Sequence, residues 1–107
     1  MDIGVTHDRV RAGHYLVRSH AVQHALKQGF EPRHMVDAVP GGMVIEADPD
    51  DQRSLVCGQA TPVGSATVYL HVVCEYADPV YVEFVTAYVP DEAQREIPPF
   101  RRRKRRR

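Results

Sequence analysis

Two histidines stand one helical turn apart near the start of the chain, in the segment "SHAVQHA" of residues 19–25. His20 and His24 are four positions apart, which places both imidazoles on one face of a helix. Such a pair can ligate a metal ion, take part in acid/base chemistry, or form an ordinary part of the surface. The rest of the sequence has to distinguish these three roles.

A zinc site requires a third and usually a fourth protein ligand. The chain contains neither a Cys-x-x-Cys pair nor an "HExxH" motif. We therefore predict no metal ion and no other cofactor. His71 is another candidate for chemistry, although its place beside Tyr69 in an apolar segment is equally typical of a hydrogen-bonded structural histidine.

Length and composition predict one small domain. The 107 residues are enough for a single hydrophobic core. The chain has no apolar run of the roughly 18 residues that a membrane span needs, and its start, "MDIGVTHDRVRAGH", lacks the apolar segment of a secretory signal. We expect a cytoplasmic protein without membrane association. Cys57 and Cys74 lie in apolar segments, which favours buried, reduced thiols over a disulfide.

The formal net charge of zero conceals a strong asymmetry. Residues 101–107 read "RRRKRRR", so the other seven basic residues and all 14 acidic residues precede this tail. Seven adjacent like charges repel one another, which predicts a disordered segment over residues 98–107. Its candidate partners are nucleic acid phosphates, an acidic protein surface, or the acidic body of the same chain. The residues that would bind nucleic acid are Arg101, Arg102, Arg103, Lys104, Arg105, Arg106 and Arg107.

The helix signals lie in the first 42 residues. Residues 1–14 are weakly patterned and are assigned to a loose arm or a short helix. A helix is predicted over residues 20–28, with Ser19 as its N-cap and Gly29 at its end. A second helix begins at Pro32 and stops at "PGG". The segment "HYLVRS" before the first of these helices could form a short edge strand.

From Met43 onward the apolar residues recur with a period of two, which indicates strands. The strand segments are "MVIEA", "RSLVCGQA", "ATVYLHVVCEY" and "VYVEFVTAYV", separated by "DPDDQ", "TPVGS" and "ADP". Short turns between consecutive strands predict a four-stranded antiparallel sheet. We expect an α+β domain over residues 15–97, with both short helices packed on one face of that sheet.

The alternation also predicts which side chains share a face. In the third strand segment Val68, Leu70, Val72 and Cys74 should meet the helices, and Tyr69, His71, Val73 and Glu75 should lie on the open side. In the last strand segment Tyr88 shares its parity with Phe84. Without a bulge near Ala87 it would therefore pack toward the helices.

Several segments, in this order, resemble the domain of unknown function family 4258, a bacterial group related to RelE-like and BrnT-like toxins. The resemblance covers residues 15–90 and implies the ribonuclease-like α+β scaffold of those toxins. The segments that carry it are Ser19-His20-Ala21, Gly29-Phe30, Ile45-Glu46, Leu55-Val56-Cys57-Gly58, Leu70-His71-Val72-Val73 and Thr86-Ala87-Tyr88-Val89-Pro90.

The resemblance implies RNA cleavage without a metal ion. That reaction needs a base for the 2′-hydroxyl, an acid for the leaving oxygen and a cation at the phosphate. The candidate catalytic residues are His71, Arg53, Tyr88, and His20 or His24.

The chain departs from the family pattern at two positions on the first of the two predicted helices. His24 stands where the family has an arginine, and Gln28 where a basic residue is common. We expect His24 to face the groove in place of that arginine. His20 is expected to be neutral near the helix N-terminus and to orient the helix against the sheet.

Two classes of function follow. The first is a toxin-like endoribonuclease, with RNA as substrate and a cognate antitoxin as partner; the order of the segments and His71 favour it. The second is a catalytically inert relative that binds a protein or nucleic acid through the basic tail; the acidic body and the missing basic residues favour it. The tail could instead lie on the body, where the acceptors would be Glu46, Asp48, Asp50, Asp51, Asp91, Glu92 and Glu96.

Overall fold

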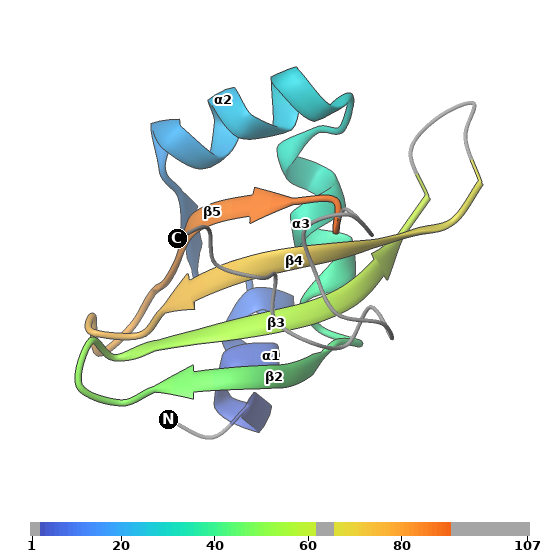
Figure 1. The fold of residues 1–107 in the computed structure, drawn as a ribbon. Helices are drawn as coiled ribbons and strands as arrows, with labels where there is room; N and C mark the ends of the chain where they lie inside the picture. The colour runs from blue at the N-terminus through green and yellow to red at the C-terminus, as the bar shows by residue number, and fades with distance from the viewer. Residues whose placement is uncertain (1–2, 62–65, 91–107) are drawn as a thin grey trace.

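The computed structural model describes residues 3–61 and 66–90 (Figure 1). Within these ranges three helices accompany one five-stranded sheet, whose strand order is β1-β5-β4-β3-β2. The elements in chain order are α1 (Ile3–Arg11), β1 (Tyr15–Val17), α2 (Ser19–Gln28), α3 (Pro32–Ala38), β2 (Met43–Asp48), β3 (Arg53–Ala60), β4 (Val68–Glu75) and β5 (Val82–Tyr88).

The predicted four-stranded antiparallel sheet with two helices is wrong. A fifth strand, β1, pairs in parallel with β5 through Tyr15 opposite Val82 and Val17 opposite Phe84, so the sheet is mixed. The other three strand pairs are antiparallel. A strand of three residues is too short to show a period, and its partner lies near the other end of the domain. Nothing local in the sequence could therefore indicate this pairing.

The third helix, α1, forms in the segment that the sequence left open as a loose arm or a short helix. Its Val10 is buried in the core. Arg9 donates hydrogen bonds from Nη1 to the Asp78 carbonyl at 3.1 Å and from Nη2 to the Pro79 carbonyl at 2.7 Å. A helix of nine residues is marginal by itself, so these tertiary contacts stabilise it.

The ends of α2 and α3 follow from local chemistry. Gly29 ends α2 in the left-handed conformation, with φ of 81°, which glycine adopts without a steric penalty. The helix begins at Ser19, one residue earlier than predicted. Its N-cap is therefore Arg18 and not Ser19. At the start of α3 the backbone N–H of Glu31 donates to His34 Nδ1 at 2.8 Å. This contact accounts for the buried His34 as a capping residue.

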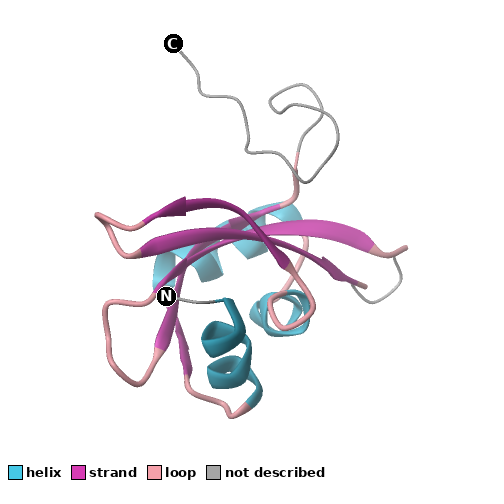
Figure 2. Ribbon diagram, turned by 90° about the horizontal axis from the view of Figure 1, so that it is seen from below, coloured by secondary structure: helices cyan, strands magenta, loops and turns pink. Residues whose placement is uncertain are grey.

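The core lies between the sheet and the helices, so the sheet has a covered face and an open face. Figure 2 shows α1 and α3 on one side of the sheet, and α2 contributes Ala21 and Ala25 to the same core. Packing is tight where α3 crosses β3, since a Cβ added at Gly58 would lie 2.0 Å from the Ala38 carbonyl oxygen. The other fully buried core side chains include Met35, Val39, Val56, Leu70, Val72, Val82 and Phe84.

The alternation predicted for β4 agrees with the structure. Leu70, Val72 and Cys74 belong to the core beneath the covered face. Cys57 and Cys74 are both free and buried, as predicted. Cys74 lies in the core and Cys57 pairs with His71 on the opposite face, so the sheet separates the two sulfurs. Burial raises the pKa of the Cys74 thiol to about 12.

A bulge in β5 changes which way its last residues point. Val73 pairs with Thr86, and the next residue of β4, Cys74, pairs with Phe84, so Val85 is an extra residue in the ladder. Phe84 and Ala87 are consequently both in the core. Tyr88 faces the open side, opposite His71. The bulge lies two residues before Ala87. Without it, Tyr88 would share the covered face with Phe84; with it, Tyr88 lies on the open face.

Candidate functional site

Cys57, His71 and Tyr88 form a row across the open face. They occupy adjacent strands and are directly paired, Cys57 with His71 and His71 with Tyr88. His71 Nδ1 lies 3.4 Å from the Tyr88 hydroxyl, and their ring centroids are 5.2 Å apart. The His71 side chain is completely buried, whereas Tyr88 is half-buried. Tyr88 is therefore the member of this pair that reaches the surface.

Tyr88 also lines a hollow of about 360 Å³ on the open face. The residues that line it include an apolar group, Leu55 and Val73, and an acidic group on the strand and turn before β3. The described residues that define the hollow are Glu46, Asp48, Asp51, Arg53, Ser54, Leu55, Val73 and Tyr88. Three of its side chains are carboxylates and one is a guanidinium.

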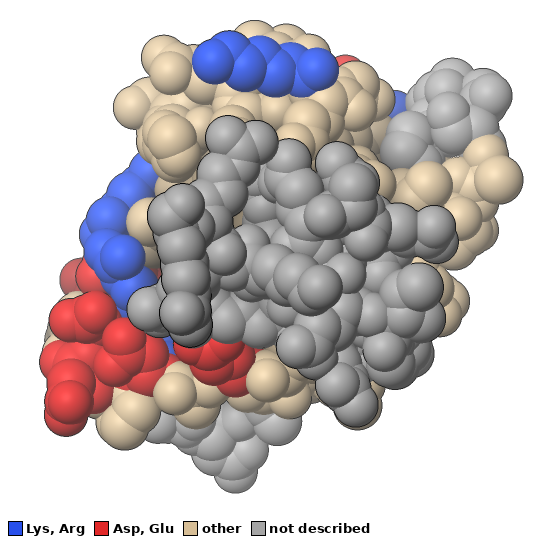
Figure 3. Space-filling model, viewed as in Figure 1, with Lys and Arg blue, Asp and Glu red and all other residues tan. Residues whose placement is uncertain are grey.

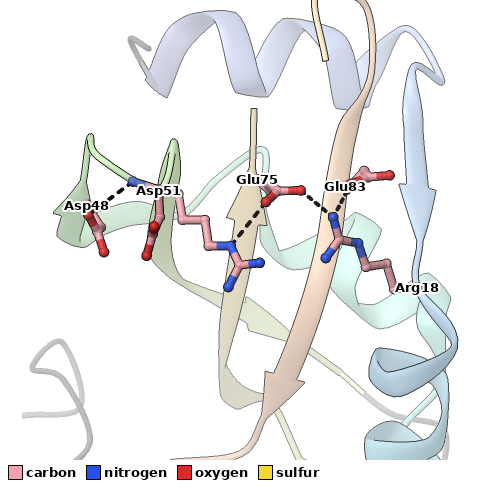
Figure 4. Close-up of polar contacts among 6 residues, drawn as sticks. Arg18, Asp48, Asp51, Glu75 and Glu83 are labelled. Atoms are coloured by element: carbon pink, nitrogen blue, oxygen red, sulfur yellow. Dashed lines mark hydrogen bonds and ion pairs between the residues drawn. The ribbon is translucent and has the colours of Figure 1, made fainter. Parts of the chain in front are cut away.

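A chain of ion pairs crosses the open face beside the hollow (Figure 4). Arg53 Nε lies 3.3 Å from Glu75 Oε1. Arg18, which follows β1, contacts the carboxylates of both Glu75 and Glu83, the latter at 2.5 Å. The four residues come from β3, β4, β5 and the end of β1, so the ion pairs join strands that are distant in the sequence.

These ion pairs shift the pKa values of Arg18 and Glu75. The hydrogen bond to Glu83 raises the pKa of Arg18, against the opposing effect of partial burial, and the charges of both glutamates add to it. For Glu75, partial burial acts to raise the pKa. Hydrogen bonds with Glu83 and Arg53 and the charges of both arginines outweigh it, so the pKa of Glu75 is lowered.

The charge distribution on the open face differs from that expected at an RNA-cutting site. Arg18 and Arg53 are matched by Glu75 and Glu83, so their charges cancel. The carboxylates of Asp48 and Asp51 then add negative charge to the hollow. In the view of Figure 3, acidic side chains gather over the end of the sheet where β2 turns into β3. Phosphate binding requires the opposite sign of charge.

The two histidines of α2 lie away from the hollow. His24 Nδ1 is 2.8 Å from the Ala87 carbonyl oxygen, and the N–H of Val89 donates to Gln28 Oε1 at 2.6 Å. β1 pairs with β5 only as far as Phe84. Beyond that point His24 and Gln28, one turn apart on α2, hydrogen-bond the edge of β5. They take the place of a neighbouring strand there.

The orienting role expected of His20 therefore falls to His24. His24, which was expected to face the groove, orients α2 against the sheet. His20 is exposed and stacks on His24 with a centroid distance of 5.5 Å. His24 and Gln28 both have a structural role at the edge of β5 that β1 leaves uncovered.

The structure thus brings together three of the predicted site residues, His71, Tyr88 and Arg53, and leaves His20 and His24 on α2. The predicted nucleic-acid-binding residues 101–107 lie outside the described residues. Sequence reasoning missed Arg18, Glu75 and Glu83 as parts of the site. Only the parallel pairing of β1 with β5 brings Arg18 beside the two glutamates, so no local signal could have identified it.

Comparison with known proteins gives no family for the chain. No family model, no curated protein and no solved structure matches it. In residues 3–61 and 66–90, no three side chains of His, Cys, Asp or Glu are grouped to hold a metal ion. None of the described helices has the length and apolar character of a membrane span.

Proposed function

We propose that the chain is a binding protein whose hollow on the open face receives an arginine-rich segment of a protein partner. One observation carries the proposal: the arginines of the open face are already paired with Glu75 and Glu83, while the carboxylates of Asp48 and Asp51 line the hollow. A cationic segment would neutralise these carboxylates, whereas RNA would be repelled by them.

The lining of the hollow favours arginine over lysine. A guanidinium is planar, so it can bind a carboxylate with two hydrogen bonds and stack on an aromatic ring. Asp48 and Asp51 supply carboxylates on the turn between β2 and β3, and Tyr88 supplies a ring in the same hollow. The apolar side chains of Leu55 and Val73 fit the methylene part of an arginine side chain.

A cytoplasmic location belongs to this proposal, because the free thiols of Cys57 and Cys74 are typical of a reducing compartment.

The test measures peptide binding to a variant in which residues 101–107 are replaced by serine, so that the chain's own tail does not compete. A fluorescent peptide with the sequence of residues 101–107 should bind, and the same peptide with lysine in place of arginine should bind less tightly. Asp48→Asn combined with Asp51→Asn should weaken binding about tenfold or more, which corresponds to about 1.4 kcal/mol. Absence of peptide binding would refute the proposal.

A matched control removes the same number of carboxylates elsewhere. Asp8 on α1 and Asp37 on α3 are exposed and lie outside the hollow. Asp8→Asn combined with Asp37→Asn should leave peptide affinity unchanged at moderate salt, where distant charges are screened. An equal loss in both double variants would mean that net charge, and not the hollow, attracts the peptide.

The contact between His71 and Tyr88 favours a second candidate, the metal-independent endoribonuclease of a toxin and antitoxin pair. Tyr88 would exchange a proton with the substrate, with His71 behind it as the group that accepts or returns that proton. Single-stranded RNA should then be cut in excess chelator, and Tyr88→Phe should abolish cutting in a folded protein. RNA that stays intact with the wild-type chain would rule out this candidate.

A further inference from the structure

The sequence contains a segment with the chemistry that the hollow requires. Six of the seven residues from 101 to 107 are arginine, and the seventh is Lys104. The rest of the chain has seven more acidic than basic residues, so the tail and the body carry opposite charges of equal size. Charge complementarity thus makes the tail a candidate occupant of the hollow.

The connection between the tail and the hollow is short. Tyr88 itself lines the hollow, and only residues 89–100 separate it from the first arginine of the tail. A tether of this length sets an effective concentration on the order of millimolar for the segment that it carries. Even a weak intramolecular contact would therefore exceed the binding of a separate peptide at micromolar concentration.

The last residue of β5, Tyr88, lines the hollow on the open face of the sheet. The bulge at Val85 turns Tyr88 toward the open face. The acidic turn between β2 and β3 forms the opposite side of the same hollow through Asp48 and Asp51. A segment that follows β5 can thus reach the carboxylates without passing around the sheet.

We propose that residues 101–107 occupy the hollow of their own chain and exclude arginine-rich segments of other proteins from it. This inference rests on the proposed function, because it assigns an internal competitor to the same hollow. The chain would then be autoinhibited, and a partner would have to displace the tail through contacts beyond those of a basic peptide.

The experiment compares the wild-type chain with the variant in which residues 101–107 are serine, at equal protein concentration. The probe is the fluorescent peptide with the sequence of residues 101–107, followed by anisotropy. The serine variant should bind the peptide about tenfold to a hundredfold more tightly than the wild-type chain, as expected for an internal competitor at millimolar effective concentration. Sedimentation of the wild-type chain should show a monomer.

Each other outcome has one meaning. Equal affinities of the two chains would overturn the autoinhibition and leave the proposed function standing. Failure of the serine variant to bind the peptide, with its circular dichroism spectrum unchanged, would overturn the proposed function and the inference together. Weaker binding by a wild-type chain that sediments as a dimer would show that tails are exchanged between copies, which contradicts occupancy by the same chain.

Discussion

The two faces of the sheet differ in what their side chains contact. On the covered face, Val56, Leu70 and Val72 are completely buried against the helices. On the open face, charged side chains from β3, β4 and β5 and from Arg18, which follows β1, meet around Glu75, and Tyr88 lines an acidic hollow. The covered face determines whether the chain folds, and the open face carries the groups that can bind. Substitutions on the two faces should therefore separate stability from binding.

The largest expected effect is on the covered face, at Gly58. A Cβ at this position would lie 2.0 Å from the Ala38 carbonyl oxygen and 2.6 Å from its carbonyl carbon. Because both are backbone atoms, Gly58→Ala must displace α3. We expect a loss of about 3 kcal/mol in the free energy of unfolding, measured by urea denaturation.

Gly41 provides the control for this substitution. A Cβ at Gly41 has no other atom within 4 Å. Gly41→Ala should therefore change the free energy of unfolding by less than about 1 kcal/mol. If the two variants were equally stable, the close packing of α3 on β3 would be refuted.

A smaller effect is expected on the open face, at Glu75. Its pKa is below the ordinary value of 4.5 in the folded chain, so the unfolded chain binds a proton more readily. The resulting stabilisation is present at neutral pH and is lost as the pH falls through the lowered pKa. Glu75→Gln should be less stable than the wild type at neutral pH, and its stability should fall less steeply in acid.

The measurement for Glu75 is a series of urea denaturations between about pH 6 and pH 3. Asp37→Asn, which removes an exposed carboxylate on α3, serves as the control. The ion pairs would contribute nothing to stability if Glu75→Gln and Asp37→Asn followed the wild-type curve equally closely.

The smallest expected effect concerns the helix that covers the edge of β5. His24→Ala removes the hydrogen bond to the Ala87 carbonyl and should cost about 1 kcal/mol of the free energy of unfolding. His20→Ala removes an exposed ring that only stacks on His24, and it should change stability by less than about 0.5 kcal/mol. A larger loss for His20→Ala would restore the orienting role first expected of His20.

Most individual elements were predictable because their signals are local. The period of two located β2 to β5, and Gly29 and Pro32 marked the end of α2 and the start of α3. The same period placed His71 on the open face. These features depend on residues within a few positions of one another, so the chain order alone specifies them.

The candidate site was predictable only in part. His71 and Arg53 were identified from their residue types and strand positions. The position of Tyr88 depended on a bulge, and a single extra residue reverses the face of every residue after it. Parity counting along β5 could not detect Val85 as that extra residue, because the bulge is defined by the register with β4.

The sequence by itself determined the segments of α2, α3 and β2 to β5, the burial of both thiols and the opposite charges of body and tail. Only the tertiary structure decided the parallel pairing of β1 with β5, and with it the contacts of Arg18 with Glu75 and Glu83. It also decided the hydrogen bond between His24 and the Ala87 carbonyl. This part of the edge of β5 is open to α2 because β1 ends opposite Phe84. The physical reason is common to these features: each depends on contacts between residues far apart in the chain, which no local period or spacing records.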